Sequence, residues 1–582
     1  MEETDEFIDL IRIMFDKVFH SKTRRSVVSA AINAAILLYF LFVFYCTFET
    51  DDDYAMKMIV SGAYGSPDSH IVYMNMLIGY LLKYLYEFLP SVSWYEIFHI
   101  LITYFSLTAI TSVLLDKKES SPMYLLLVFL VLFVSGRFFY VDLQFTKTAS
   151  IATVCGYLLL NHSINKDSNK ELFLSILFLF MAMLIRRRQF EAVSLVGATI
   201  FAPFLVKTYR ELKNKQISTS FKKMALAVVL CTLFFVIVPK VNDLNYKDPA
   251  WSAYRTFNSS RAALLDLRVF SYEDDPSFFD GLGLSKIDIQ ILYDCWDFDD
   301  PEVFTTDTLK AILAHEVGSK DNIVNHIKPF VFDTFVFFFE NRVNVIFVFV
   351  LDLLLIAFFS QERELLPDIS FALTLCSMIF AFVYVYFYRN YALLGRVHLS
   401  IVLAAIFVLL NDIKIEPKNY KLISIIFSSV LIVISLSLFW FDDFRINSSK
   451  KVKDDLKIQA IKEINSDPGH LYLRTTDENL DYVSSLFIPK DAYARDNLYA
   501  LGGWMTNMPL YNAVKEKFGV SNPFRDVVNN DDIFLIINSE EGKDLIIEYI
   551  RRHYDENANA QYVKSIQANK EYRVYKIVSS DD

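Results

Sequence analysis

The chain has 582 residues, of which 54% are hydrophobic, 16% aromatic and only 21% charged, and its formal net charge is −11. Soluble globular proteins average about 45–50% apolar and about 25% charged residues, and the apolar excess here falls in blocks of roughly 15–22 residues, the length that spans a bilayer. The composition excludes a soluble enzyme, a fibrous protein and a disordered chain, and the acidic balance argues against a nucleic-acid partner.

A charged segment, residues 1–25, precedes the first apolar stretch. Its apolar positions follow a helical repeat and it ends in the basic residues Lys22, Arg24 and Arg25, so we expect a cytoplasmic amphipathic segment. The charged run is too long for the first part of a cleaved signal peptide, and residues 27–48 are therefore interpreted as an uncleaved membrane anchor. Basic residues before this anchor predict that the N-terminus lies in the cytoplasm.

Ten further apolar stretches follow, and with the first they predict eleven membrane-spanning helices in a domain that covers residues 26–441. Segment 71–89 is also apolar, but counting it as a span would place the Lys-rich stretch 207–223 outside, so we expect it to lie in the outer interface or to re-enter there. The ten stretches are 94–115, 122–135, 148–163, 171–185, 190–206, 224–239, 343–360, 369–387, 397–411 and 422–441.

The distribution of basic residues sets the predicted orientation. Segments assigned to the cytoplasm carry about twice as many Lys and Arg residues as those assigned to the outside, as the positive-inside rule requires. An odd number of spans then places the C-terminus outside. A composition rich in Phe, Ile, Lys and Asn is typical of an AT-rich genome, so we expect a multi-pass integral protein of a bacterial cell membrane.

Polar outer regions are expected at loops 49–93 and 240–342 and in residues 442–582. The last region alternates helical and strand-like patterns and is interpreted as a separate extracytoplasmic soluble α/β domain. The predicted fold class is an α-helical polytopic membrane protein, with about eleven transmembrane helices and a C-terminal extracytoplasmic α/β domain. The elements expected in that domain are a helix near 449–464, strands at 470–474 and 533–537, a helix at about 540–554 and a strand at 572–578.

Three consecutive carboxylates, Asp51, Asp52 and Asp53, follow the first span directly. Like charges this close raise the pKa of at least one carboxyl group unless a cation or hydrogen-bond donors compensate. Such a cluster suits a general base, a metal site or both. The alternative interpretation is a solvated helix terminus with no chemical role.

The residues after this triplet carry a resemblance to a known family. A short polar helix-like stretch ends at Ser61 and Gly62, a turn with Pro67 follows, and then come the apolar segment 71–89 and the next span from Trp94. This order resembles the first outer loop of the polytopic GT-C glycosyltransferases, most clearly over residues 45–190. The resemblance implies a GT-C-like fold, a polyprenyl-phosphate-linked sugar donor and a catalytic carboxylate among Asp51, Asp52 and Asp53, with Asp52 the first choice.

The predicted outer segments are rich in arginine, whereas the predicted cytoplasmic segments carry mostly lysine. The planar guanidinium binds phosphate oxygens in a bidentate manner, so outer arginines at the ends of spans are candidates to bind the donor phosphate. The alternative is that they extend to ordinary lipid phosphates. The candidate phosphate-binding residues are Arg137, Arg186, Arg187, Arg188, Arg389 and Arg396.

Other side chains are weaker candidates for a substrate groove. Trp504 follows a turn at Gly502 and Gly503, where it would either stack on a sugar or be buried. The groove candidates are Tyr64, His70, Gln189, Glu191, Trp251, Arg255 and Tyr391. No ligand set for a metal is identified, although a divalent cation such as Mg²⁺ or Mn²⁺ at the leaving phosphate is one option.

The sequence thus predicts a membrane glycosyltransferase that moves a sugar from a polyprenyl-phosphate donor to an extracytoplasmic glycan, lipid or protein acceptor, with an outer-loop Asp as general base. Its partners would be the bilayer, the lipid-linked donor and the acceptor. One alternative is a polymerase or ligase of lipid-linked glycans, and another is a transporter or flippase, although no inverted repeat is visible. A cavity shared by the Asp triplet and the arginines would favour the transferase.

Overall fold

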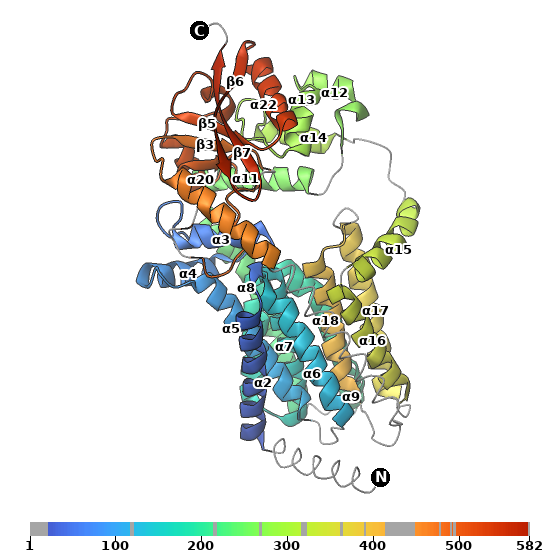
Figure 1. The fold of residues 1–582 in the computed structure, drawn as a ribbon. Helices are drawn as coiled ribbons and strands as arrows, with labels where there is room; N and C mark the ends of the chain where they lie inside the picture. The colour runs from blue at the N-terminus through green and yellow to red at the C-terminus, as the bar shows by residue number, and fades with distance from the viewer. Residues whose placement is uncertain are drawn as a thin grey trace.

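A computed structural model describes residues 21–116, 122–213, 218–266, 270–315, 323–340, 342–360, 365–388, 392–413, 448–476, 479–488, 492 and 496–579. A bundle of long helices carries a headpiece that contains a β-sheet (Figure 1). We define the headpiece as the described residues of 249–315 and 448–579. The end of the bundle next to it is called the headpiece end.

The bundle is built from eleven named helices. Seven helical segments of the described residues are long and apolar enough to cross a membrane, or up to eight if the pair Ile327–Phe339 and Asn344–Leu355, bent by 97°, forms one span. A multi-pass integral membrane protein is therefore confirmed by helix length and hydropathy. The helices are α2 (Lys22–Val43), α5 (Trp94–Leu114), α6 (Pro122–Gly136), α7 (Phe145–Lys166), α8 (Asn169–Gly197), α9 (Ala202–Lys213), α10 (Thr219–Asn245), α15 (Ile323–Glu340), α16 (Arg342–Ser360), α17 (Leu365–Tyr388) and α18 (Gly395–Asp412).

Three features account for the difference from the eleven spans expected. The stretches 171–185 and 190–206 lie in a single helical segment, Asn169–Glu211, which counts once. The stretch 148–163 lies in α7, which is helical as expected but is not among the apolar candidates. The last stretch, 422–441, lies outside the described residues, as do residues 1–20 of the predicted N-terminal segment and the predicted domain boundary at 441–442.

The segment Asn169–Glu211 reverses direction at Arg186, whose backbone is not helical (φ −155°, ψ 94°). Its 43 residues would measure about 65 Å as one straight helix, roughly twice the hydrocarbon thickness of a bilayer. Glu171 pairs with Lys22 at the start of α2, whereas Leu184, just before the reversal, accepts a hydrogen bond from the Asn75 backbone at the headpiece end. Both legs therefore run along the bundle.

Helix α7 crosses the centre of the bundle and is polar for its position. Its hydroxyl groups are satisfied within the helix: Ser150 donates to the Thr146 carbonyl at 2.8 Å and Thr153 to the Ala149 carbonyl at 2.7 Å. Such bonds to the preceding turn allow Ser and Thr to be buried in a helix. Because α7 is enclosed by other helices rather than by lipid, it does not need an apolar surface.

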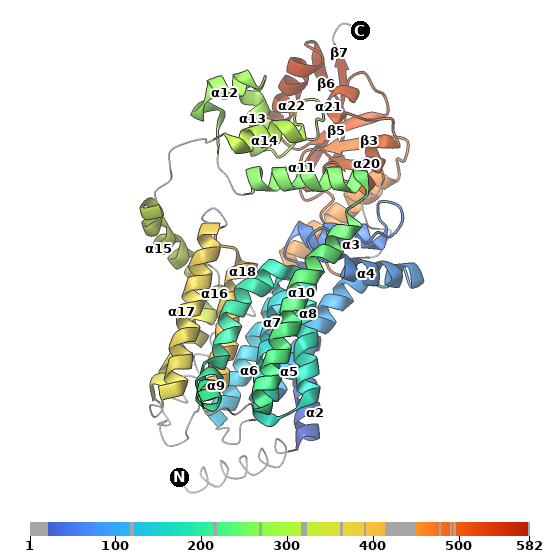
Figure 2. The same cartoon turned by 180° about the vertical axis from the view of Figure 1, so that it is seen from behind.

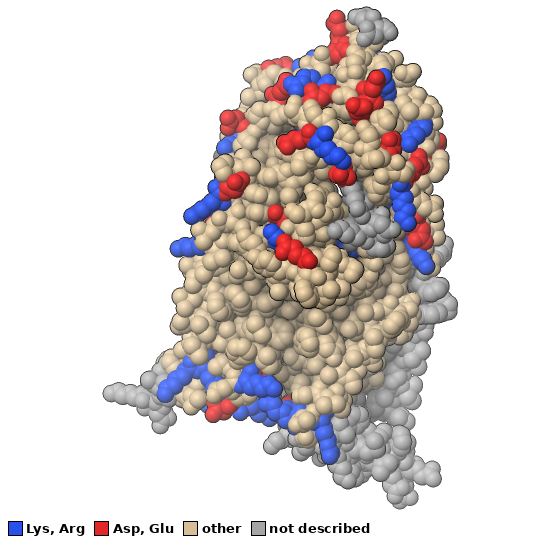
Figure 3. Space-filling model, turned by 90° about the vertical axis from the view of Figure 1, so that its left-hand side faces the viewer, with Lys and Arg blue, Asp and Glu red and all other residues tan. Residues whose placement is uncertain are grey.

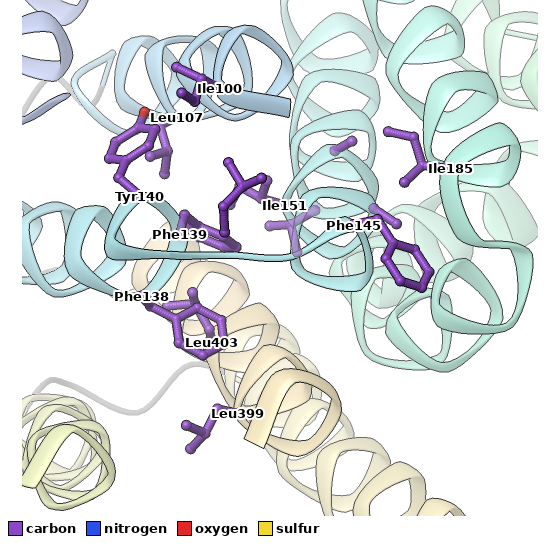
Figure 4. Close-up of a cluster of buried hydrophobic side chains, with 14 of the residues drawn as sticks. Ile100, Leu107, Phe138, Phe139, Tyr140, Phe145, Ile151, Ile185, Leu399 and Leu403 are labelled. Atoms are coloured by element: carbon purple, nitrogen blue, oxygen red, sulfur yellow. The ribbon is translucent and has the colours of Figure 1, made fainter. Parts of the chain in front are cut away.

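A core of buried apolar side chains lies in the bundle below the headpiece. The π-helix η1 (Arg137–Val141) contributes Phe138, Phe139 and Tyr140, all buried. Figure 4 shows these rings among side chains of α5, α7, α8 and α18, including Leu107, Ile151, Ile185 and Leu403. This packing fixes the helix ends that carry the polar residues described below.

Two short helices lie at the headpiece end, α3 (Asp51–Ser61) and α4 (Met76–Phe88). Helix α4 has 13 residues, too few to span a bilayer, and it lies across the bundle axis in Figures 1 and 2. Its outer side exposes Leu81, Tyr84 and Phe88. The position and the exposed apolar side chains agree with the interfacial helix predicted for 71–89.

Helix α3 is held by a small parallel sheet and by a buried ion pair. Strand β1 (Thr47–Phe48), just before it, pairs with β2 (Asp142–Leu143), just before α7. Within α3, Lys57 forms an ion pair of 2.5 Å with Glu96 of α5, and neither side chain is exposed. The first turn of α3 therefore has a fixed position relative to α5 and α7.

The headpiece contains a five-stranded mixed sheet in the order β4-β3-β5-β7-β6. Strands β4 and β5 pair parallel to β3, while β7 is antiparallel to both β5 and β6. The predicted C-terminal α/β region is confirmed, including a helix at 448–465. The other elements are β3 (Leu471–Arg474), β4 (Leu498–Ala500), α20 (Pro509–Glu516), α21 (Pro523–Asp526), β5 (Ile533–Ile537), α22 (Glu540–His553), β6 (Ala558–Gln567) and β7 (Glu571–Ser579).

The region after α10 packs against this sheet and shares its hydrophobic core, as Figure 2 shows. Two buried carboxylates make the connection. Asp299 accepts hydrogen bonds from Tyr499 (2.7 Å) and Lys515 (2.6 Å), and Asp300 accepts from Tyr549 (2.8 Å). The elements of this region are α11 (Pro249–Leu265), η3 (Tyr272–Asp274), α12 (Pro276–Gly281), α13 (Lys286–Ile289), η4 (Gln290–Asp294) and α14 (Thr306–Ala314).

Charged side chains are sparse across the middle of the face that Figure 3 draws. Figure 3 shows a broad band without charge, a group of Lys and Arg side chains at the end opposite the headpiece, and mixed charges on the headpiece. The exposed cations at that opposite end include Lys22, Lys166 and Lys207. The uncharged band has the pattern expected of a surface that faces lipid.

Candidate functional site

The three carboxylates of the predicted triplet occupy the first turn of α3 and have different environments. Asp53 is completely buried and accepts hydrogen bonds from the Tyr95 hydroxyl (2.8 Å) and the Phe145 backbone N–H (3.0 Å). Burial raises its pKa well above the usual value, and these two donors oppose that shift. Asp53 thus joins α3 to α5 and to the start of α7.

Asp52 is partly exposed, and the charges of two arginines of the bundle act on it. Burial raises its pKa to about 6, and the negative charge of Asp51 adds to the rise, whereas the charges of Arg396 and Arg186 oppose it. A carboxyl group with this pKa is a carboxylate at neutral pH and still basic enough to accept a proton from a reacting group.

Arg186 reaches this side of α3 from the reversal of α8. It donates a hydrogen bond to the Tyr73 carbonyl (3.3 Å), and its guanidinium lies over the rings of Tyr73 (5.4 Å) and Phe145 (5.2 Å). Leaving the helical conformation at this residue directs its side chain away from its two neighbours. Arg186 is therefore placed by the fold-back and not by helix periodicity.

Arg396 lies in the first turn of α18. Among the described residues its side chain makes no hydrogen bond, ion pair or ring contact, and its charge acts on Asp52. An arginine at a helix end without a local partner keeps all its donors available to an anion.

The other predicted arginines have different surroundings. Arg187 pairs with Glu191 (2.9 Å) and lies over the Phe235 ring of α10, while Arg188 donates to the Tyr388 hydroxyl of α17. Arg137 is buried and pairs with Asp142 at 2.6 Å, which is a structural contact. Gln189 is buried beside them, and its amide nitrogen has no partner in the described structure. Arg389 and Tyr391 lie outside the described residues.

Asp51 faces the headpiece instead. It lines a shallow, open pocket together with side chains of the headpiece, among them Arg474, Asp481, Tyr482 and Trp504, and with Tyr64 from the loop after α3. Partial burial raises the pKa of Asp51. Of the substrate-groove candidates predicted from the sequence, Tyr64 is therefore the one that lines this pocket.

The pocket lies at the carboxyl ends of two parallel strands, β3 and β4, the position at which parallel sheets most often bind ligands. Gly502 follows β4, and a Cβ at this position would lie 1.7 Å from the Trp296 carbonyl oxygen, so no other residue fits. Gly503 has φ +91°, a conformation that glycine adopts without strain. These two glycines direct Trp504 to the pocket, where its ring lies 4.9 Å from that of Tyr73.

His70, Trp251 and Arg255 form a different cluster. The His70 ring stacks on Trp251 at 3.7 Å and bonds to Asp68 and to the Asn245 carbonyl, and Arg255 pairs with Asp243. These contacts join the loop after α3 to α10 and α11. The structure does not bring the three residues to the Asp51 pocket.

Several residues of this site were not singled out from sequence. Tyr73 connects Arg186 with Trp504, and Arg474 and Asp481 form an ion pair of 2.6 Å in the pocket. The one available signal was that Arg474 ends a predicted strand, since strand ends carry binding residues in α/β sheets. Nothing in the local sequence indicates the roles of Tyr73 and Asp481.

No group of three or more His, Cys, Asp and Glu side chains in the described part of the chain is arranged to hold a metal ion. The Asp triplet does not form such a group because its members face the bundle arginines, the headpiece and the interior. No protein-family model, no curated protein and no solved structure matches the chain.

Proposed function

We propose that this protein is a membrane glycosyltransferase that moves a sugar from a polyprenyl-phosphate-linked donor to an acceptor hydroxyl, with Asp52 as general base. The acceptor would be an extracytoplasmic glycan, lipid or protein. The resemblance of the first outer loop to that of GT-C glycosyltransferases is consistent with this proposal. The observation that carries it is a partly exposed carboxylate, Asp52, on which the charges of Arg186 and Arg396 act, while Arg396 has no partner among the described side chains.

The proposed reaction divides its steps between the carboxylate and the arginines. The Asp52 carboxylate takes the proton from the acceptor hydroxyl, and the acceptor oxygen attacks the anomeric carbon of the donor sugar. The bond from that carbon to the phosphate oxygen breaks, and Arg396 and Arg186 stabilise the charge on the leaving lipid phosphate. Positioned general-base help of this kind contributes about 10²–10⁴-fold to a rate.

The proposal also implies a membrane topology. It keeps the eleven crossings expected from the sequence, and the two legs of α8 and the buried helix α7 are counted as three of them. The headpiece then lies outside, with the N-terminus in the cytoplasm. The lysine-rich end opposite the headpiece is consistent with this orientation. A lipid-linked donor would reach Asp52 sideways from the bilayer, because the arginines lie where the bundle ends.

The proposal is tested with purified protein in lipid vesicles, a panel of polyprenyl-phosphate sugars and measurement of the released lipid phosphate. Reactions are run with and without Mg²⁺ or Mn²⁺, because carboxylates and phosphate together bind such ions. We expect release with at least one donor, and a loss of about 10²–10³-fold in Arg396→Gln, since that side chain would stabilise the leaving charge.

The matched control is Arg210→Gln, an exposed arginine of α9 at the opposite end of the bundle, which should retain wild-type release. Absence of release with every donor, or equal rates in Arg396→Gln and wild type, would contradict the proposal.

A further inference from the structure

The pocket beside Asp51 differs chemically from the arginine-rich side of α3. Asp51 and Asp52 are consecutive in a helix, so their side chains project about 100° apart. The charges of Arg186 and Arg396 act on Asp52, while Asp51 lines the pocket with Arg474, Asp481 and aromatic side chains of the headpiece. A ligand in this pocket would therefore lie beside Asp51, on a different side of the first turn of α3 from the one that Asp52 occupies.

The charge of the pocket disfavours an anion. Among the described residues that line it, Arg474 is the one cation, and this side chain is already paired with Asp481 at 2.6 Å. The Asp51 carboxylate is left without a paired cation, so the lining carries a net negative charge. A phosphate or carboxylate ligand would be repelled, whereas hydroxyl groups could donate to the two carboxylates.

One buried donor of a pocket-lining side chain has no partner among the described residues. Arg474 is 6% exposed and donates through Nη1 to the Thr475 and Thr476 carbonyls, but its Nε has no hydrogen-bond partner in the described structure. Leaving a buried donor unsatisfied costs about 1–3 kcal/mol. A ligand oxygen that accepts from this Nε would remove that cost.

The remaining lining is aromatic and partly open to solvent. Trp504, Tyr482 and Tyr64 line the space. Flat aromatic side chains with nearby carboxylates and a guanidinium offer both an apolar face and hydrogen-bonding groups. A sugar ring has the matching combination of apolar C–H faces and hydroxyl groups.

We propose that this pocket binds a neutral saccharide and that this saccharide carries the acceptor hydroxyl, an inference that rests on the proposed function. Donor phosphate and acceptor sugar then occupy different sides of the first turn of α3. Trp504 stacks on the acceptor ring, and the Nε of Arg474 donates to one of its oxygens. Because Tyr73 connects Trp504 with Arg186, the two subsites are in contact.

Binding is tested first without any reaction. Tryptophan fluorescence of the protein in detergent is titrated with neutral trisaccharides of glucose, mannose, galactose and N-acetylglucosamine, and with a trisaccharide of glucuronic acid. We expect a saturable change with at least one neutral trisaccharide, none with the anionic one, and loss of the change in Trp504→Ala. Trp94→Phe, in a different part of the headpiece end, serves as control and should behave as wild type.

Kinetics then assign the pocket to the acceptor. Trp504→Ala should raise the acceptor KM about tenfold, with the donor KM unchanged, and Trp504→Phe should restore most of the affinity. Arg474→Lys keeps a charge next to Asp481 but lacks Nε, so it should also raise the acceptor KM while the melting temperature is retained. A rise in the donor KM alone, or no saturable binding of any neutral trisaccharide, overturns the inference.

The two proposals fail in different ways. If Trp504-dependent saccharide binding is found but no donor releases lipid phosphate, the pocket is a saccharide site and the proposed transferase function is wrong. If release depends on Asp52 but the acceptor KM is unchanged in Trp504→Ala, the transferase function stands and the pocket does not hold the acceptor.

Discussion

The three consecutive aspartates of α3 have the same side chain, but each lies in a different environment. Each residue of a helix turns by about 100°, so the first turn of α3 directs Asp53 inward, Asp52 to the arginines and Asp51 to the headpiece. Asp53 already accepts three hydrogen bonds from the protein, from Thr50, Tyr95 and Phe145. Asp51 and Asp52 are both accessible, and Asp52 is the one whose pKa is raised to about 6.

The raised pKa of Asp52 predicts a pH dependence for transfer. The base must be deprotonated, so kcat/KM should be constant well above pH 6 and should fall about tenfold per pH unit below it. The measurement is initial-rate release of lipid phosphate between pH 4.5 and 8.5. A rate that is independent of pH across this range would contradict the role of Asp52.

The arginine beside Asp52 supplies a second check of the same profile. Arg396 lowers the pKa of Asp52. The variant Arg396→Gln should therefore move the acidic limb of the pH–rate profile, measured on its residual activity, to higher pH, whereas Arg210→Gln should leave the position of this limb unchanged. A loss of rate without any shift of the limb would mean that Arg396 does not act on Asp52.

At the scale of elements, the helices and strands with a strong local residue pattern were predicted from the sequence. The interfacial helix at 71–89, the strands of the sheet at 470–474 and 533–537 and the helix at 540–554 have strong patterns of their own. Arg186 to Arg188 mark the junction of two apolar stretches, and the structure reverses the chain there. The polar residues of α7 did not prevent the prediction of a helix at 148–163, because the apolar residues of this stretch still predict one.

Contacts between distant elements could not be predicted. Asp299 and Asp300 look like part of an acidic solvated loop, yet their partners Tyr499, Lys515 and Tyr549 make them buried anchors of the headpiece. The Asp51 pocket likewise needs Arg474 and Trp504, more than 400 residues further along the chain. Periodicity and composition carry no information about which distant segments meet.

The buried pair of Asp299 and Lys515 should therefore be important for stability. Removing one partner of a buried ion pair costs about 3–5 kcal/mol, because the other charge stays buried without compensation. Asp299→Ala should lower the melting temperature of the headpiece and expose it to limited proteolysis. Asp307→Ala, an exposed aspartate of α14, is the control. Equal melting temperatures in the two variants would show that the pair does not hold the headpiece together.

At the scale of the whole molecule, an uncharged band separates a lysine-rich end from the headpiece. The proposed reaction requires the headpiece outside, where an acceptor is available. Single cysteines at Lys310→Cys in the headpiece and Lys222→Cys at the opposite end test this orientation, with the five native cysteines replaced by alanine. In intact cells a membrane-impermeant maleimide should label only the first variant. Labelling of only the second would reverse the proposed topology.

The central claim is that Asp52 is the base in a transfer from a lipid-phosphate sugar. The most direct test is single-turnover release of lipid phosphate by wild type and by Asp52→Asn, together with measurement of donor binding and melting temperature. We predict that Asp52→Asn loses about 10²–10⁴-fold in rate, with donor binding and melting temperature close to wild type. A variant that transfers sugar at the wild-type rate would contradict the claim.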